Sequence, residues 1–489
     1  MIAMKKCLTL ILVCALALSL CACGSAAPTA ETTTAATQAP SGFMVGFGSG
    51  DVTPDWPIGL QGYGNHDTRI STGLQSYIYI LCLAVTDAEG ETVLIMSLDG
   101  GSNFDGSIRP FIETEFGIPQ DHMILSAIHQ HSTPHGGEKY VQLLQKAARQ
   151  AVQQALDDRA PATMYLNTVE TEALSFVRHY IANDPDGTII TDNYNDAIGN
   201  QYGYKCHESE SDKEMRLVKF VRGEDKKPII LVNFQAHPHM GAGSSNTNIH
   251  ADWPGAMRER VADKLDAHCM YISGAGGNLN STSRISSENV SADFKHHGER
   301  AANYVIQAEG SYVEASTGDI KVKQLTNSYA TDHSMDHLLP QATIINDLRS
   351  KDFELAKQEV KNYPELHSIY HATSIVTKVS RGATYDLTIS AISIGDLVFT
   401  SHPYEMFDTN GMELRAGTVG NENYAAEDQL ENPYAMTVIC TISNGHLGYV
   451  PSKLGYTNGG YSTDIAYLAP GSGEQLVGDY LAILNELHD

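Results

Sequence analysis

Residues 123–131 read Met-Ile-Leu-Ser-Ala-Ile-His-Gln-His, an apolar run that stops at two histidines. A second stretch has the same form, because the apolar residues 229–234 are followed by His237-Pro-His239. Short apolar runs of this kind are typical of buried strands, and a histidine at a strand end is aimed into a cleft. Neutral imidazole is the commonest protein ligand for zinc. His129 and His237 therefore predict one shared metal site, with chance placement among the chain's 20 histidines as the alternative.

Strand-like and helix-like segments alternate along the body of the chain. Two hairpins are expected at 76–98 and 215–234, and helices at 104–116, 140–156 and 252–265. This mixture favours an α/β fold with a mixed sheet flanked by helices over a purely parallel sheet. Three further elements are expected in the second half: a helix at 344–363, a strand at 387–400 and a helix at 474–487.

The first residues resemble a bacterial lipoprotein leader. A basic start precedes an apolar stretch at 8–20, which is too short to span a bilayer comfortably. The motif Leu-Cys-Ala-Cys23-Gly predicts a signal peptide at 1–22 and a lipid on Cys23; a plain secretory signal cut after Ala22 is the alternative. Two acyl chains give stable anchoring. Residues 23–42 should form a flexible Ala/Thr/Pro linker, so that the domain at 43–489 works on the extracellular side of the cell membrane.

The charge of the chain limits the partners that it can bind, and its cysteine content indicates whether disulfides are expected. The chain has 58 acidic and 32 basic residues, a formal charge of -26, and loss of the leader makes it about two units more negative. Nucleic acid is therefore excluded as a partner, since phosphate binding needs a basic face. Outside the leader and Cys23, four scattered cysteines are expected to be free thiols: Cys82, Cys206, Cys269 and Cys440.

The order of three motifs resembles the neutral/alkaline ceramidases, in their N-terminal catalytic domain. Residues 46–54 read Gly-Phe-Gly-Ser-Gly-Asp-Val-Thr-Pro, and residues 60–65 read Leu-Gln-Gly-Tyr-Gly-Asn. Residues 125–134, Leu-Ser-Ala-Ile-His-Gln-His-Ser-Thr-Pro, are similar to that family's Leu-Ser-x-x-His-x-His-Ser-x-Pro signature. The resemblance extends from about Val45 to Tyr461 with a divergent middle. It implies the ceramidase catalytic fold without the C-terminal β-sandwich of that family.

The resemblance implies a zinc ion and the residues around it. The family's zinc ligands match His129, His237, Glu405 in His-Pro-Tyr-Glu and Tyr449 in Asn-Gly-His-Leu-Gly-Tyr. Two neutral histidines and one carboxylate leave the ion positively charged, which lowers the pKa of bound water. A phenol such as that of Tyr449 can ligate the ion or donate to a developing oxyanion. His131 would then shuttle a proton or contact the substrate.

One segment departs from the family. Its Gly-Asp-x-Ser-Pro motif supplies a serine assigned to catalysis, whereas residues 277–281 here read Gly-Asn-Leu-Asn-Ser. Asn280 stands in place of that serine and cannot act as an oxygen nucleophile, although it can position water or an amide carbonyl. The departure weakens the case for ceramide as the substrate and leaves amide hydrolysis possible.

Four further residues are candidates to hold a ligand or contact the substrate. Asp99 ends a strand and is placed to hold a ligand imidazole. Asp252 is expected chiefly to cap the helix at 252–265. Arg178 is a candidate for binding a carboxylate or phosphate, or for a surface ion pair. His446 lies in the segment that carries Tyr449.

Together these features predict a lipid-anchored, extracellular, zinc-dependent hydrolase of an amide bond, with a small-molecule or lipid-like N-acyl substrate. Two alternatives stay open. One is a surface-binding lipoprotein with the same fold and no catalysis, which Asn280 favours. The other is a hydrolase of another ester or amide in the cell envelope.

Overall fold

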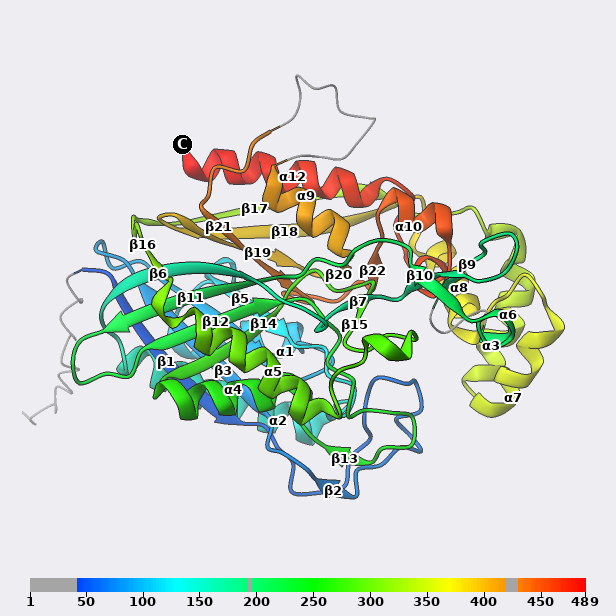
Figure 1. Cartoon of the computed structure of the whole chain (residues 1–489), viewed down its shortest axis with the longest axis horizontal. Helices are drawn as coiled ribbons and strands as arrows, with labels where there is room; N and C mark the ends of the chain where they lie inside the picture. The colour runs from blue at the N-terminus through cyan, green and yellow to red at the C-terminus, as the bar shows by residue number, and fades with distance from the viewer. Residues whose placement is uncertain (1–41, 192–195, 418–429) are drawn as a thin grey trace, which may run out of the picture. The chain divides into compact units, whose positions relative to one another are not determined.

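A computed structural model of the chain describes residues 42–191, 196–417 and 430–489. The signal peptide, Cys23 and all but the last residue of the predicted linker lie outside these ranges. The central element is a nine-stranded mixed sheet (Figure 1). Its strands, in order across the sheet, are β14 (His268–Ser273), β12 (Ile229–Phe234), β11 (Glu214–Arg222), β6 (Ala160–Glu170), β1 (Met44–Asp51), β3 (Tyr79–Thr86), β4 (Thr92–Leu98) and β5 (Met123–Ala127), with β16 (Val313–Ala315) beside β6.

The pairs β12–β14 and β4–β5 are parallel, and the remaining neighbours are antiparallel. The sheet curls so that strands from its two ends approach each other. The Ser97 hydroxyl of β4 donates a 2.6 Å hydrogen bond to the carbonyl of Tyr271 in β14. The ends of strands that are far apart in the sheet order therefore lie close together.

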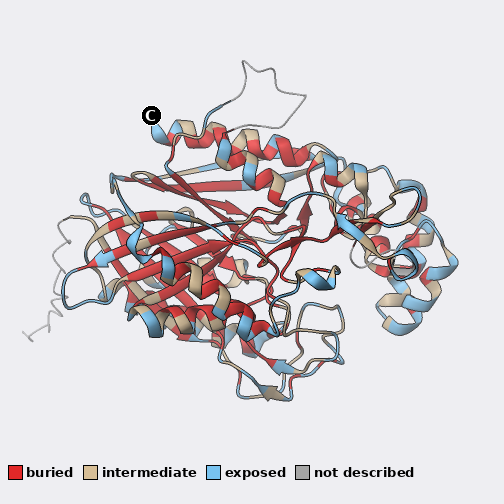
Figure 2. Ribbon diagram, in the orientation of Figure 1, coloured by how far each residue is buried: buried red, intermediate tan, exposed pale blue. Residues whose placement is uncertain are grey.

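A second, four-stranded sheet packs inside this curve. It consists of β17 (Ile320–Ala330), β18 (Thr384–Ile394), β19 (Leu397–His402) and β21 (Met436–Thr441). Side chains from both sheets form one hydrophobic core, in which Ile95, Leu231 and Phe399 are fully buried. Figure 2 shows this buried centre as a continuous region across the strands of both sheets.

Helices cover the outer faces of both sheets (Figure 1). Helices α1 (Asp105–Phe116) and α2 (Glu138–Asp157) pack on the β1–β5 half of the large sheet, and α4 (Asp252–Leu265) and α5 (Phe294–Gln307) on the β11–β14 half. Helix α12 (Ser472–His488), with α9 (Asp408–Ala416) beside it, covers the small sheet. The predicted α/β class with a mixed sheet flanked by helices is confirmed.

The remaining elements surround the ends of the strands. Three helices form a lobe at one side of Figure 1: α6 (Leu339–Arg349), α7 (Phe353–Glu359) and α8 (Ile369–Arg381). The short elements are β2 (Gly73–Leu74), β7 (Phe176–Val177), β8 (His179–Ala182), β9 (Ile189–Thr191), α3 (Asp196–Tyr202), β10 (Tyr204–His207), β13 (Asn248–Ile249), β15 (Leu279–Asn280), β20 (Glu405–Met406), β22 (Tyr449–Val450), α10 (Lys453–Asn458) and α11 (Tyr461–Asp464).

Two predicted elements are wrong in detail. The helix expected at 344–363 is two helices, α6 and α7, because the Asp352 carboxylate caps the start of α7 by accepting from the Leu355 amide. The strand expected at 387–400 is the hairpin β18–β19, which turns at Gly395 with φ of 55°. A Cβ at that glycine would lie 2.1 Å from the Ser316 carbonyl oxygen, so only glycine fits the turn.

Cys82, Cys206, Cys269 and Cys440 are free thiols, as expected, and only Cys206 of these is exposed. Among the residues described, no helix combines the length and the apolar character needed to cross a bilayer.

Three alternate glycines of β1 let that strand lie directly on helix α2. A Cβ atom added at any of them would lie about 2 Å from a carbonyl oxygen of α2, which is shorter than any non-bonded contact. The helix presents alanines four residues apart to this face, all of them buried. The pairs are Gly46 with Ala155, Gly48 with Ala151 and Gly50 with Ala147.

We expect Gly48→Ala to lower the free energy of unfolding by about 3 kcal/mol, because a methyl group there meets helix backbone that cannot move aside. Chemical denaturation beside the wild type measures the change. Gly106→Ala is the matched control, since a Cβ at that exposed position meets nothing within 4 Å. Equal unfolding midpoints for the wild type and Gly48→Ala would contradict this packing.

Candidate metal centre

His129 follows β5 in a strained conformation. Its φ is 64°, in the left-handed region that non-glycine residues seldom adopt. Its Nδ1 lies 3.1 Å from the Gly101 carbonyl oxygen. A carbonyl can only accept, so Nδ1 carries the proton and the lone pair of Nε2 faces the cavity.

His237 follows β12 and is held in the same way. Its Nδ1 lies 3.1 Å from the carbonyl oxygen of Gly276 and 2.9 Å from that of Leu279. Backbone carbonyls thus fix the tautomer of both imidazoles. The two rings lie 4.9 Å apart, centroid to centroid, although the residues are 108 positions apart (237 minus 129).

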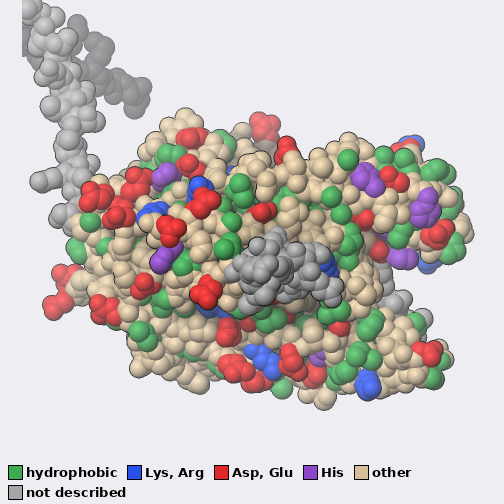
Figure 3. All heavy atoms as spheres, turned by 90° about the horizontal axis from the view of Figure 1, so that it is seen from above, with side chains coloured by type: hydrophobic (Ala, Val, Ile, Leu, Met, Phe, Trp, Pro, Cys, Tyr) green, Lys and Arg blue, Asp and Glu red, His purple; other side chains and the backbone are tan. Residues whose placement is uncertain are grey.

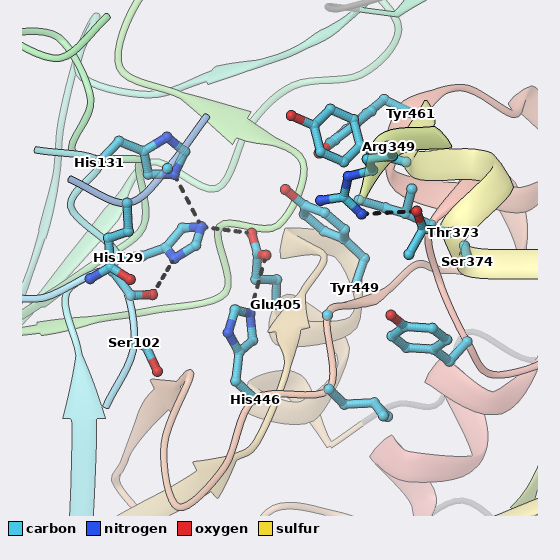
Figure 4. Close-up of a pocket in the computed structure, with 18 of the residues that line it drawn as sticks. Ser102, His129, His131, Arg349, Thr373, Ser374, Glu405, His446, Tyr449 and Tyr461 are labelled. Carbon is cyan, nitrogen blue, oxygen red and sulfur yellow. Dashed lines mark hydrogen bonds and ion pairs between the residues drawn. The ribbon is translucent and has the colours of Figure 1, made fainter. Parts of the chain in front are cut away.

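Glu405 faces both imidazoles from β20, a short strand that follows β19 of the small sheet. Its Oε2 lies 3.3 Å from His129 Nε2 and 3.2 Å from His237 Nε2, and its Oε1 lies 3.5 Å from His446 Nε2. Figure 4 shows His129 and His446 directed at this carboxylate. Burial raises the pKa of Glu405, but His129 and the other two nearby imidazoles outweigh burial and hold it well below its ordinary value.

The acceptor atoms of His129, His237 and Glu405 converge as they would around a bound cation. When Nδ1 alone carries a proton, each imidazole directs the lone pair of Nε2 at a carboxylate oxygen, so acceptors face acceptors; Glu405 correspondingly raises the pKa of His129 against the effect of burial. Within the described residues, the buried His237 Nε2 and Glu405 Oε2 have no hydrogen-bond partner. Unpaired buried acceptors are costly unless a proton or a metal ion lies among them. Two imidazole nitrogens and one carboxylate oxygen are a usual ligand set for catalytic zinc.

His131 lies beside the pair. Its Nε2 is 3.4 Å from His129 Nε2, and the ligand atoms of His129, His131 and His237 all lie within 4.8 Å of one another. The structure thus makes His131 a possible third imidazole ligand in addition to a proton carrier. Burial and the neighbouring histidines lower the pKa of His131 well below its ordinary value, so the ring is neutral. Gly62 packs against it, since a Cβ there would lie 2.5 Å from His131 Cβ.

Tyr449 is paired with Glu405 by the short strands β20 and β22, in which these two residues are register partners. The ring is buried, and the Arg178 guanidinium lies 5.2 Å from its centroid. Burial and the charge of Glu405 raise the pKa of Tyr449, which keeps the phenol protonated.

Arg178 itself is buried and donates to the Gly277 carbonyl at 2.7 Å and to the Ser462 hydroxyl at 2.6 Å. Its guanidinium therefore supports the loop and the tyrosine. The prediction that Arg178 forms a surface ion pair is wrong, because the side chain points inward.

Asn280 lies in β15, next to His237 in a parallel bridge. It is buried and lines a second cavity together with His131, His237 and Tyr449. The adjacent Ser281 instead donates its hydroxyl to the His237 carbonyl at 2.6 Å, which leaves it no role as a nucleophile.

Two predicted supporting roles are wrong. Asp99 contacts no imidazole of the cluster: both of its oxygens accept from Arg258 of α4, at 2.7 and 2.6 Å. The strand has already ended at Leu98, and the carbonyl that contacts His129 belongs to Gly101, two residues beyond Asp99. Asp252 begins α4 as expected, yet its side chain does not cap the helix. It accepts from the Gly241 amide at 2.7 Å and so holds the loop after His239; burial raises the pKa of Asp252 to about 6.

The sequence analysis missed the wall opposite the histidines. The cavity at the cluster has a volume of about 480 Å³, within the range of ligand sites. Helices α6, α8 and α11 supply that wall, including Arg349, Tyr370 and Tyr461 (Figure 4). No motif marks these residues, because separate helices contribute them. His371 of α8 and His367, which lies just before that helix, gather around Asp464 of α11 as a second group with metal-ligand geometry.

Comparison with known proteins gives the fold. No family model matches the chain, and no curated protein matches it by sequence. A crystal structure of neutral ceramidase from Pseudomonas aeruginosa is similar, with a TM-score of 0.66, 15% identity, and coverage of 92% of this chain and 75% of that chain. A ceramidase complexed with C2 matches with a TM-score of 0.64 and 14% identity, over 91% of this chain and 76% of that one. The chain has the fold of the neutral ceramidases.

Proposed function

We propose that this protein is a ceramidase-like, zinc-dependent hydrolase of an amide (N-acyl) bond. The observation that carries the proposal is the convergence of His129, His237 and Glu405, with unpaired acceptor atoms directed at one point. The fold shared with two ceramidases supports it. These three residues would hold the ion, with Tyr449 or His131 close enough to complete the ligand set.

The bound zinc would act as a Lewis acid, which polarises the amide carbonyl and lowers the pKa of water. The protein groups would do the rest. The protonated Tyr449 phenol donates to the carbonyl oxygen as negative charge develops there. Neutral His131 accepts a proton from the attacking water and delivers it to the leaving nitrogen. Asn280 orients the water or the carbonyl. A C–O bond forms, the C–N bond breaks, and the products leave as a carboxylate and an ammonium ion, which together keep both protons of the water.

Metal content and turnover together test the proposal. We expect the purified full-length protein to contain about one zinc per chain and to cleave members of an N-acyl amide panel. A chelator should abolish turnover, and added zinc should restore it. Loss of a residue that only hydrogen-bonds to a metal ligand lowers metal affinity by roughly 10- to 100-fold. Glu405→Gln should lower zinc affinity by more than this, because Glu405 would be a ligand itself.

His337→Ala is the control for this test, because His337 lies on the exposed surface beside Glu365. It should retain both zinc and activity. Turnover that survives complete metal removal would contradict the proposal. Bound zinc without turnover of any amide or ester would favour the alternative that Asn280 raises, a binding protein with this fold.

The location is a separate part of the proposal. We infer that the protein is anchored on the extracellular side of the membrane by lipid on Cys23, from the leader motif alone. Cys23→Ser should move the protein from the membrane fraction to the soluble fraction, because both acyl chains are lost. Cys206→Ser, at an exposed thiol of the body, is the control. A Cys23→Ser protein that stays with the membrane would refute the lipid anchor.

A further inference from the structure

Two arginines enter the cavity from the wall opposite the histidines. Arg349 ends α6 and Arg381 ends α8, and both line the cavity that contains His129 and Glu405. Figure 4 shows Arg349 on the same side as Tyr449 and Tyr461, across Glu405 from His131. Both guanidinium groups therefore belong to the space in which a substrate would bind the metal centre.

Neutral groups hold both side chains in place. Arg349 Nη1 donates to the Thr373 hydroxyl at 2.9 Å, and its guanidinium lies 5.1 Å from the Tyr370 ring centroid. The Arg381 guanidinium lies 4.7 Å from the Tyr385 ring and 4.3 Å from the Tyr467 ring. Stacking on aromatic rings orients a guanidinium while its in-plane N–H donors stay available.

Neither arginine has a carboxylate partner within 4.0 Å among the described residues, although the chain carries 58 acidic side chains against 32 basic ones. Acidic side chains are frequent over the face in Figure 3, whereas Lys and Arg are sparse. Other arginines of the body are paired with acids, such as Arg258 with Asp99 and Arg149 with Glu115. In this cavity the two guanidinium groups instead face neutral neighbours.

The rest of the lining adds no compensating negative charge. Of the cavity's described lining residues, Glu405 alone is acidic, and its oxygens face three imidazoles. Tyrosines, hydroxyls and imidazoles dominate the lining, and aliphatic side chains are few, with Leu447 and Ile465 among them. A metal ion would make the cavity more positive still. Arg381 is exposed and Arg349 is half-buried, so an uncharged, wholly apolar substrate would cover the Arg349 guanidinium without offering it an acceptor.

We propose that the amide substrate carries an anionic group, a carboxylate, sulfonate or phosphate, and that Arg349 binds it with Arg381 beside it. The inference rests on the proposed amidase function and names its substrate class. Carboxylate and phosphate oxygens match the planar donors of a guanidinium in bidentate geometry. A net negative protein would otherwise repel such a substrate, so the arginines provide local attraction where it is needed.

A panel of hexanoyl amides tests this on the full-length protein. N-hexanoylglycine, N-hexanoyltaurine, N-hexanoyl-phosphoethanolamine and the longer N-hexanoyl-aminohexanoate carry the anion on the amine side, and N-succinyl-hexylamine carries it on the acyl side. N-hexanoylethanolamine is the neutral reference. For at least one anionic member, kcat/KM should exceed that of the reference by about 10- to 100-fold, as a charge-assisted hydrogen bond contributes.

Arg349→Met should bring the ratio of kcat/KM for the anionic substrate to kcat/KM for the neutral reference to about one, chiefly by raising KM for the anionic substrate. Arg349→Lys should keep part of this preference, because lysine still supplies a positive point charge. Arg149→Met is the matched control: Arg149 also stacks on an aromatic ring, that of Phe111, but lies on the surface. The control should leave the ratio unchanged. Thermal unfolding of each variant verifies that it is folded.

The outcomes separate the two proposals. Turnover of the neutral reference at a rate equal to or above that of every anionic member would overturn the anionic substrate and leave the amidase intact. An equal loss by Arg349→Met on all substrates would show that the arginine only supports the wall, and would also overturn the inference. Absence of turnover across the panel in zinc-loaded protein would overturn the proposed function, and this inference with it.

Discussion

The candidate metal centre depends on the closure of the curled sheet by β21. The Ser126 hydroxyl of β5 donates to the Thr441 carbonyl of β21 at 2.8 Å, and the Thr441 hydroxyl donates to the Gly274 carbonyl, just after β14, at 2.8 Å. Thr441, the last residue of β21, thus joins strands from the two ends of the large sheet. It brings the residues that follow β5 and β12 to one place. The parallel neighbour of β21, β19, delivers Glu405 to the same place from the small sheet.

Backbone groups then orient the side chains of the candidate metal centre. Carbonyl oxygens fix both histidine tautomers, and register pairing of β20 with β22 places Tyr449 next to Glu405. The left-handed backbone of His129 costs on the order of 1 kcal/mol, and the surrounding core supplies the rigidity that maintains it.

Local sequence patterns predicted the parts of this structure that local physics determines. The apolar runs before His129 and His237 are fully buried strands, and the hairpins and the start of α4 at Asp252 follow from turn residues and periodicity. The nearness of Glu405 and Tyr449 to the two histidines came from motif resemblance, because no spacing rule joins the β20–β22 pair to residues that follow strands of the large sheet. The partner of Asp99 could not be predicted, since Arg258 reaches it from a helix 159 residues away.

The arginine-bearing wall illustrates the same limit. Arg349 and Arg381 lie in the divergent middle of the chain, and only the packing of α6 and α8 against the strand ends turns them toward the cavity. In the sequence neither arginine is marked: Arg349 lies inside the helix expected at 344–363, and Arg381 precedes the strand expected at 387–400. Their significance depends on the absence of nearby carboxylates among the described residues, which is a property of the tertiary structure.

Anomalous diffraction at the zinc edge from crystals of the protein tests the central claim most directly. The account predicts one strong peak in contact with His129 Nε2, His237 Nε2 and Glu405 Oε2, and the same map would show whether Tyr449 or His131 is a further ligand. A zinc-loaded crystal whose only peaks lie elsewhere, such as at His367, His371 and Asp464, would contradict it.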